Sequence, residues 1–377
     1  MNKDVIILGI VSFINDTASK IILPILPLFI QQLGGGGFAI GLISGLGETV
    51  ASVCYFLSGV WSDLMGRRKI FIFWGYIISA FSKGLFAFAQ SWPQVLVFKL
   101  GERVGKGFRD APRDAMLAGH MKKHGKTFGV HRALESSGAV LGGVVVLFLL
   151  WVLGFNFRSA FILAGFLSLF CIIPLIFVRE PNIKPQKVDF WLCLHCLSPS
   201  LKLFLFIATL FSLGNFSYMF FVLKSQSIFA GANAVIWPII LYTIYNVSYS
   251  LFAIPFGYWS DRVGRKGVLI LGYALFGAVC LGFLFAHSLW AFITLFALLG
   301  LNYAMVNSNE RAFVADLAPK DHRATALGIF HMFTSLAILP GGLIAGYLWD
   351  ISPLFTFVYG IVISVVAFHL LAFWIRK

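Results

Sequence analysis

Nine ionisable side chains interrupt segments of the chain that are otherwise apolar. Four are acids and five are bases: Asp16, Lys20, Glu48, Lys83, Lys99, Glu102, Arg103, Glu135 and Lys224. A charged side chain inside a lipid-like interior costs about 2.5–3.5 kcal/mol unless it is paired or hydrated. Each of the nine is therefore a candidate for holding a charged solute, carrying a proton or forming an internal ion pair.

The acids indicate proton chemistry, and the bases indicate a negatively charged solute. A carboxylate in a low-dielectric environment can take up and release a proton near neutral pH. Glu48 is the first candidate for this role and Asp16 the second. Lys and Arg donate charge-assisted hydrogen bonds to anions. The deep cations therefore favour an anionic or carboxylate-bearing solute, and they are Lys20, Lys99, Arg103 and Lys224.

Internal pairing is the alternative for several of these groups. Asp16 and Lys20 are four residues apart, so they share a helix face and can pair. Arginine stays charged and needs a counter-ion. Glu102 is adjacent to Arg103 but points elsewhere on a helix, so Asp16 or Glu48 is the expected partner of Arg103. Lys83 can instead extend outward to the membrane surface.

Twelve long apolar segments must position these residues. Of the 377 residues, 59% are hydrophobic and 12% are charged, against about 45–50% and about 25% in a soluble domain. A transmembrane helix needs about 20 mainly apolar residues. Segments of this kind occupy 5–31, 38–61, 70–90, 93–115, 128–152, 157–178, 201–229, 234–259, 268–286, 290–313, 324–348 and 353–375. The chain is therefore expected to be an all-α membrane protein, which excludes a cytosolic enzyme, a disordered protein and a soluble nucleic-acid-binding protein.

The basic residues between the segments predict the orientation. The chain has 29 Lys and Arg against 15 Asp and Glu, a net charge of +14. The basic residues gather in the loops after the even-numbered segments, for example at 67–69 and 262–266, and at both termini. Basic loops stay in the cytoplasm. This pattern predicts a multi-pass protein of the bacterial inner membrane with both termini cytoplasmic, and it accounts for the positive charge without nucleic acid.

The chain divides into two similar halves. The charged segment 179–200 contains three prolines and separates an N-terminal six-helix bundle, 1–178, from a C-terminal one, 201–377. The sequence GVWSDLMGRR, which starts at Gly59, recurs as GYWSDRVGRK at Gly257, 198 residues later. Arg113 and Arg311 have the same offset. An internal repeat of this kind is typical of secondary transporters.

The repeated loop, G-x-x-x-D-x-x-G-R-[RK], resembles the signature of the major facilitator superfamily (MFS), and the resemblance covers the whole chain. It implies two pseudo-symmetric six-helix bundles that work by alternating access, with spans one, four, seven and ten lining the cavity. The stretches 103–115 and 12–16 also resemble one bacterial subgroup, in which an acid is expected where Lys20 stands. The candidate substrate and coupling residues are Asp16, Lys20, Glu48, Lys99, Glu102, Arg103, Asn215, Tyr218, Lys224 and Asn307, and Asn302 and Tyr303 of span ten are further candidates to complete the site.

The resemblance also implies a cytoplasmic gate that holds one state and breaks on switching. Asp63 can accept charge-assisted hydrogen bonds from Arg67 or from a neighbouring helix end. Span four ends close to this loop, and the second half carries a repeat-related set. The expected gate residues are Asp63, Arg67, Arg109, Arg113, Asp114, Asp261, Arg265, Glu310 and Arg311.

These features predict a secondary active transporter of a small solute, coupled to protons and working as a monomer in lipid. The expected substrate is an organic anion or a metal-chelating, siderophore-like molecule, and the alternative function is proton-driven export of drugs or other hydrophobic compounds. Neither a Walker A motif nor a nucleophile motif is present, so neither ATP-driven transport nor an enzyme is expected, and no cofactor is needed. Cys193, His195 and Cys196 supply three of the four ligands of a closed zinc site, which is weak support for a metal.

Overall fold

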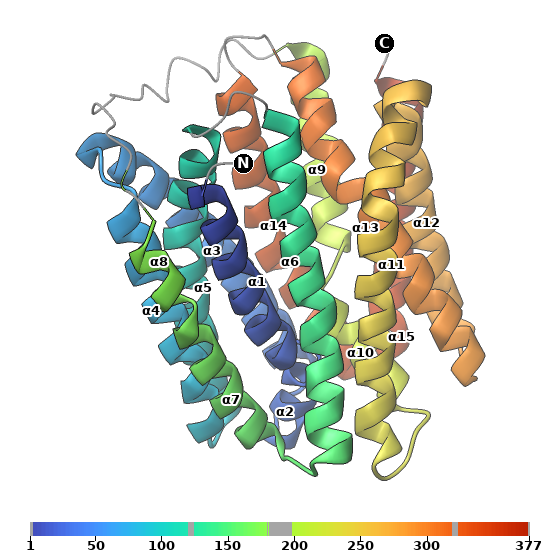
Figure 1. Ribbon diagram of the computed structural model, residues 1–377. Coiled ribbons are helices and arrows are strands. Elements are labelled where there is room, and N and C mark those ends of the chain that lie inside the picture. The colour runs from blue at the N-terminus through green and yellow to red at the C-terminus, as the bar shows by residue number, and fades with distance from the viewer. Residues whose placement is uncertain (1–2, 120–123, 179, 181–197, 319–322, 376–377) are drawn as a thin grey trace. The chain divides into compact units, whose positions relative to one another are not determined.

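The protein is all-helical in the part of the chain that the computed structural model describes, residues 3–119, 124–178, 180, 198–318 and 323–375 (Figure 1). No strand occurs among these residues. Each of the twelve expected spans corresponds to one helix or to two consecutive helical pieces. Ten of them are long and apolar enough to cross a membrane. The other two are α5, which is rich in charged residues, and α6, whose apolar part is the shorter stretch Ser137–Val152. The predicted fold class is therefore confirmed.

The helices form two compact units. The N-terminal unit comprises Met1–Gly35 and Gly47–Val188, and the C-terminal unit comprises Gly36–Leu46 and Asp189–Lys377. The first ten elements are α1 (Lys3–Ile22), α2 (Leu26–Gln32), α3 (Gly37–Met65), α4 (Lys69–Leu85), η1 (Phe86–Phe88), α5 (Trp92–Gly119), α6 (His124–Leu147), η2 (Phe148–Val152), α7 (Phe157–Phe170) and α8 (Ile172–Ile176). The remaining elements are α9 (Pro199–Gly214), α10 (Tyr218–Gln226), α11 (Asn233–Val263), α12 (Arg265–Phe285), α13 (Leu289–Leu317), α14 (Arg323–Ile351) and α15 (Pro353–Trp374). Most of the expected linker, 179–200, lies outside the described residues, so its role stays a prediction.

The first and seventh spans are each broken into two helices. In the first span, α1 ends before Pro24, which has no backbone N–H to continue the helical hydrogen bonds. In the seventh, Asn215 ends α9 and the Ser217 hydroxyl accepts a hydrogen bond from the Met219 N–H to start α10. Discontinuous helices of this kind supply free backbone groups and side chains at substrate sites of transporters.

Small residues bring α4 and α5 of the N-terminal unit close together. A Cβ atom placed on Gly105 of α5 would lie 2.6 Å from the carbonyl oxygen of Gly75 on α4. Any side chain at Gly105 would therefore push the two helices apart. Around this contact the unit buries a core that includes Leu8, Tyr76 and Met116.

The core of the C-terminal unit is mainly aromatic. Phe216 stacks on Phe221 with ring centroids 5.2 Å apart, and Phe283 stacks on Phe357 at 5.3 Å. Stacked and edge-on ring pairs stabilise a core beyond their buried area. Many phenylalanines of this half therefore serve to pack the core of the unit.

The start of α3 packs in the C-terminal unit and is capped by a distant carboxylate. Asp350, near the end of α14, accepts hydrogen bonds from the N–H groups of Gly37, at 2.6 Å, and Phe38, at 2.9 Å. A carboxylate at a helix N-terminus satisfies unpaired N–H groups and complements the helix dipole. Asp350 therefore determines where α3 begins, although it lies more than 300 residues away in the sequence.

Candidate substrate and coupling sites

Four charged residues of the N-terminal unit form one continuous network. The Lys99 Nζ atom lies 2.7 Å from Glu102 Oε2, and the same oxygen lies 3.5 Å from Arg103 Nε. The Arg103 Nη2 atom in turn lies 2.8 Å from Glu48 Oε1. Two cations and two carboxylates therefore cancel one another. Lys99 and Glu102 are buried, whereas the Glu48 side chain is 39% exposed.

This network revises two expectations about Arg103. Asp16 and Glu48 were the two expected partners of Arg103. Glu48 forms the ion pair, and Asp16 does not. Glu102 does reach Arg103, although it was expected to point elsewhere, because its carboxylate folds back between Lys99 and Arg103.

Asp16 and Lys83 meet around an asparagine that the candidate set omitted. Lys83 of α4 is 1% exposed, and its Nζ atom lies 2.7 Å from Asn15 Oδ1 and 3.0 Å from Ser168 Oγ. The Asn15 amide also donates to Asp16 Oδ1 at 3.4 Å. The suggestion that Lys83 extends outward is therefore wrong: it is buried between α1, α4 and α7. The expected Asp16–Lys20 ion pair is not formed. The side chain of Asp16 instead accepts the hydrogen bond from Asn15.

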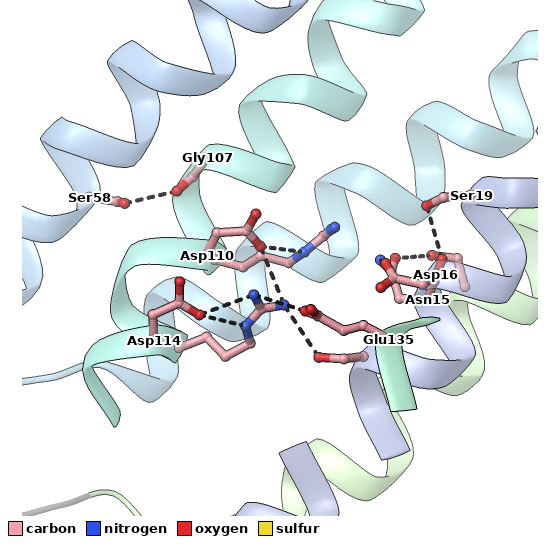
Figure 2. Close-up of polar contacts among 12 residues, drawn as sticks. Asn15, Asp16, Ser19, Ser58, Gly107, Asp110, Asp114 and Glu135 are labelled. Carbon is pink, nitrogen blue, oxygen red and sulfur yellow. Dashed lines mark hydrogen bonds and ion pairs between the residues drawn. The ribbon is translucent and has the colours of Figure 1, made fainter. Parts of the chain in front are cut away.

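A second charged cluster joins α1, α5 and α6 of the N-terminal unit (Figure 2). Arg113 lies 3.1 Å from Asp114, 3.3 Å from Glu135 and 3.5 Å from Asp110. It also donates to the Ser12 hydroxyl at 3.3 Å. Arg113 of α5 is therefore bound to α6 through Glu135 and to α1 through Ser12, while Asp110 and Asp114 of its own helix add to the negative charge around it.

Arg109 and the Arg113 cluster do not contact Asp63, although Arg109, Arg113 and Asp114 were expected as its latch partners. The guanidinium of Arg109 instead lies over the Tyr76 ring, 4.6 Å from its centroid. Arg109 and Arg113 are buried inside the unit, and all three residues precede the end of α5 at Gly119.

The partner of Asp63 is Arg68 rather than Arg67. The Arg68 Nη2 atom lies 3.0 Å from Asp63 Oδ1, and its Nη1 atom donates to the carbonyl of Ala115 on α5 at 2.8 Å. Gly66 adopts a left-handed conformation with φ 64°, which turns the chain so that Arg68 returns beside Asp63. Arg67 is exposed and forms no ion pair with another described residue.

The repeated loop in the C-terminal unit makes a similar but not identical set of contacts. Arg265 Nη2 lies 3.1 Å from Asp261 Oδ1, and Arg265 Nε lies 2.5 Å from Asp316 on α13. Asp316 was not among the expected gate residues. Glu310 and Arg311 were expected here, but they lie elsewhere on α13 because they precede its end by two turns.

The third basic residue of each loop binds the end of the last span of its own unit. Lys69 donates to the carbonyls of Ile176 and Val178, and Lys266 donates to those of Ala372 and Ile375. Cations at a helix C-terminus satisfy free carbonyls and complement the dipole. These residues therefore close each bundle, in addition to any role in topology.

Glu310 is a buried carboxylate without an ion-pair partner among the described residues. Its Oε1 atom accepts a hydrogen bond from the Tyr273 hydroxyl of α12 at 2.7 Å, and its side chain is buried. Tyr273 is itself fully buried and stacks on Phe211 at 3.9 Å. Arg311, the next residue, acts on Glu310 only through space.

Arg311 has a neutral hydrogen-bond partner instead of a carboxylate. Among the described residues it forms one hydrogen bond. Its Nη2 atom donates to Asn307 Oδ1 at 2.6 Å, one turn earlier on α13. Arg311 is only partly buried, and neither of its other two nitrogen atoms is a buried donor without a hydrogen-bond partner. Tyr303 lies one further turn along the same helix face and is 39% exposed. The structure therefore joins Asn307, an expected substrate residue, with Arg311, an expected gate residue.

The other expected substrate residues lie at separate places. Asn302 is buried and donates to the Gly272 carbonyl, so its amide is used in helix packing. Asn215 and Tyr218 lie at the break in the seventh span, and the Tyr218 ring is 4.9 Å from that of Tyr242. Lys224 is in the last turn of α10, and Lys20 is in the last turn of α1, where Gly142 of α6 leaves room for it.

No metal site is found in the part of the chain that is described. No group of three or more His, Cys, Asp or Glu residues there has the arrangement to hold a metal ion. Cys193, His195 and Cys196 lie outside the described residues.

Comparison with known proteins identifies the family of this chain. The family model of the Major Facilitator Superfamily matches residues 8–227 and 204–377. An uncharacterized MFS-type transporter of Methanocaldococcus jannaschii is 43% identical over 378 residues, covering 99% of this chain and 95% of the relative. The quinolone resistance protein NorA of Staphylococcus aureus is 22% identical over 370 residues, covering 93% and 91%.

Solved structures of low sequence identity have the same fold. A variant of the nucleoside transporter NupG superposes with a TM-score of 0.83 at 18% identity, covering 98% of this chain and 100% of that one. The human organic anion transporter MFSD10 superposes with a TM-score of 0.69 at 17% identity, covering 98% and 100%. The family match over both halves, together with the full-length relative, shows that this chain is a membrane transporter of the major facilitator superfamily.

Proposed function

We propose that this protein is a secondary active transporter that moves an organic anion across the membrane by alternating access. The observation that carries the proposal is Arg311, a partly exposed residue whose guanidinium has no carboxylate partner among the described residues. Arginine remains charged and presents a planar set of donors that matches a carboxylate. An anionic substrate would supply the missing counter-ion.

The deep cations of the N-terminal unit are less suited to this role. Lys99 and Arg103 are already neutralised by Glu102 and Glu48, and displacing those carboxylates would leave them buried without partners. The anion site therefore belongs to α13 of the C-terminal unit, with Asn307 orienting the guanidinium.

Glu310 is the carboxylate best placed to couple the anion to a proton. A buried acid without a cation partner is the kind of group that exchanges protons in transporters. Glu48 and Asp16 remain the carriers expected from sequence, but Glu48 has Arg103 as its partner. When Glu310 is protonated, Arg311 is left with a full positive charge for the anion. When Glu310 is ionised, the two charges offset each other.

The same proposal includes the expected placement of the chain. The protein acts as a monomer in a cytoplasmic membrane, with both termini in the cytoplasm, and the loops around Asp63 and Asp261 form the gate. The second candidate function, export of hydrophobic drugs, is supported by the similarity to a quinolone resistance protein. An exporter of this kind would not require a carboxylate on its substrates.

Uptake into proteoliposomes with a matched panel of solutes tests the proposal. The panel contains carboxylates, their neutral amides and amines with the same skeleton, each with and without an imposed pH gradient. Carboxylates should enter at least about tenfold faster than their amides, since a charge-assisted hydrogen bond contributes about 1.5–3 kcal/mol. Equal transport of amides and acids would contradict an anion site.

Replacing Glu310 by Gln should separate transport from proton coupling. Glutamine imitates the protonated acid, so Arg311 keeps its charge and exchange of anion between the two sides should continue. Acceleration of net uptake by a pH gradient should fall by about tenfold or more. His331 of α14 lies within electrostatic range of Arg311, so a His331→Gln variant is measured in parallel and should retain coupling.

The Glu48→Gln variant supplies the comparison between the two coupling hypotheses. It should still respond to the gradient if Glu310 is the carrier. Loss of the response in Glu48→Gln with full retention in Glu310→Gln would assign coupling to Glu48 instead.

A further inference from the structure

Five tyrosines of the C-terminal unit form a continuous row of rings. Tyr218 of α10 lies 4.9 Å from Tyr242 of α11, which lies 5.8 Å from Tyr245. Tyr303 of α13 lies 6.0 Å from Tyr245 and 5.0 Å from Tyr249. The chain has 11 tyrosines and 41 phenylalanines, so almost half of the tyrosines gather in this row, whereas the core beside it is built from phenylalanine.

The hydroxyl groups show that the row borders an accessible space. Tyr245 and Tyr249 donate no hydrogen bond to another described residue. Neither hydroxyl oxygen is a fully buried atom that lacks a partner. Tyr303 is 39% exposed. A buried tyrosine hydroxyl needs a polar partner. Tyr245, Tyr249 and Tyr303 therefore present ring faces to a space outside the protein core, and Tyr245 and Tyr249 also present their hydroxyls.

The exposed end of the row lies next to Arg311 along α13. Tyr303, Asn307 and Arg311 are spaced by four residues and so share one helix face. Because Arg311 reaches back to Asn307, its guanidinium lies about one turn, roughly 6 Å, from the level of Tyr303. An aromatic surface and an accessible cation are thus separated by about the size of a small organic acid.

We infer that Tyr245, Tyr249 and Tyr303 form a subsite for an aromatic ring, and that the substrate is an aryl-bearing carboxylate. The ring lies against the tyrosines by stacked or edge-on contacts, which favour another π system over a saturated ring of similar bulk. The carboxylate extends toward Arg311. This inference rests on the proposed anion site, and it adds the chemical class of the remainder of the substrate.

Uptake of three related solutes by the intact protein in proteoliposomes tests the subsite. The aromatic acid is 3-phenylpropanoate, whose ring and carboxylate are joined by two methylene groups. The saturated acid is 3-cyclohexylpropanoate, and the neutral aromatic solute is 3-phenylpropanamide. We expect the aromatic acid to enter about tenfold faster at low concentration than the saturated acid, and faster still than the amide.

Variants locate the effect on the tyrosines. Tyr303→Leu and Tyr249→Leu should reduce the preference for the aromatic acid to about twofold or less, while uptake of the saturated acid changes little. Tyr303→Phe keeps the ring and should retain most of the preference. The matched control is Tyr347→Leu, because Tyr347 is in the same unit, on α14, but is 64% exposed and outside the row. It should behave as wild type.

The outcomes distinguish this inference from the proposed function. If both acids enter equally well and the amide does not, the aromatic subsite is wrong and the anion site stands. If the amide enters as well as the acids, or no acid enters, the proposed function fails and this inference fails with it. Uptake of the saturated acid by the Leu variants also reports that they are folded.

Discussion

Replacing Arg311 by Gln is expected to reduce uptake of an organic anion by about 30- to 100-fold. The change removes the accessible cation of α13 but keeps a side chain that can still contact Asn307. Hydrogen bonds to charged groups contribute about 1.5–3 kcal/mol each, and each 1.4 kcal/mol is a factor of ten in affinity. The loss should appear mainly as a higher KM, measured from initial rates in proteoliposomes.

Two further variants show whether the geometry of the guanidinium matters as well as its charge. Arg311→Lys keeps the charge but presents a point charge instead of a planar set of donors, so we expect uptake between wild type and Arg311→Gln. Lys202→Gln removes one positive charge from an exposed position of α9 and should leave uptake unchanged. A wild-type KM in Arg311→Gln would contradict the anion site.

Replacing Glu102 by Ala is expected to lower the free energy of unfolding by about 3–5 kcal/mol. Removing one partner of a buried ion pair leaves the other charge uncompensated, which is the strongly destabilising case. Here Lys99, only 2% exposed, would lose the carboxylate 2.7 Å from its ammonium group. Denaturant or thermal unfolding of the purified protein in detergent measures the effect.

A second substitution in the same pair supplies the control. Lys99→Met combined with Glu102→Met removes both charges and keeps the volume, so most of the stability should return. Glu48→Ala should be milder than Glu102→Ala, because the Glu48 side chain is 39% exposed and water can approach Arg103. If Glu102→Ala and the double variant were equally unstable, packing rather than charge would explain the loss.

The fold could be predicted from the sequence because its main signals are local. Each span is a continuous apolar segment of membrane length, and the repeat from Gly59 to Gly257 is visible without a structure. The two breaks in the first and seventh spans also have local causes, Pro24 and the Asn215–Ser217 turn. The start of α3 does not, because its capping carboxylate, Asp350, comes from the end of the chain.

The sites were less predictable because their contacts join distant segments. Lys83 is buried by Asn15 and Ser168, which belong to two other helices. Glu310 and Arg311 were assigned by the repeat, but a repeat predicts backbone position and not side-chain partners. Neighbours on a helix point to different faces, so Glu310 contacts Tyr273 while Arg311 faces Asn307.

Binding of labelled 3-phenylpropanoate to purified wild-type and Arg311→Gln protein tests the central claim most directly. Equilibrium binding needs neither a gradient nor a complete transport cycle, and comparison of the acid with its amide isolates the contribution of the carboxylate. The account predicts saturable binding to wild type that excess 3-phenylpropanoate displaces and 3-phenylpropanamide does not, and binding at least about tenfold weaker in Arg311→Gln. Equal binding to both proteins, or equal displacement by the amide, would contradict it.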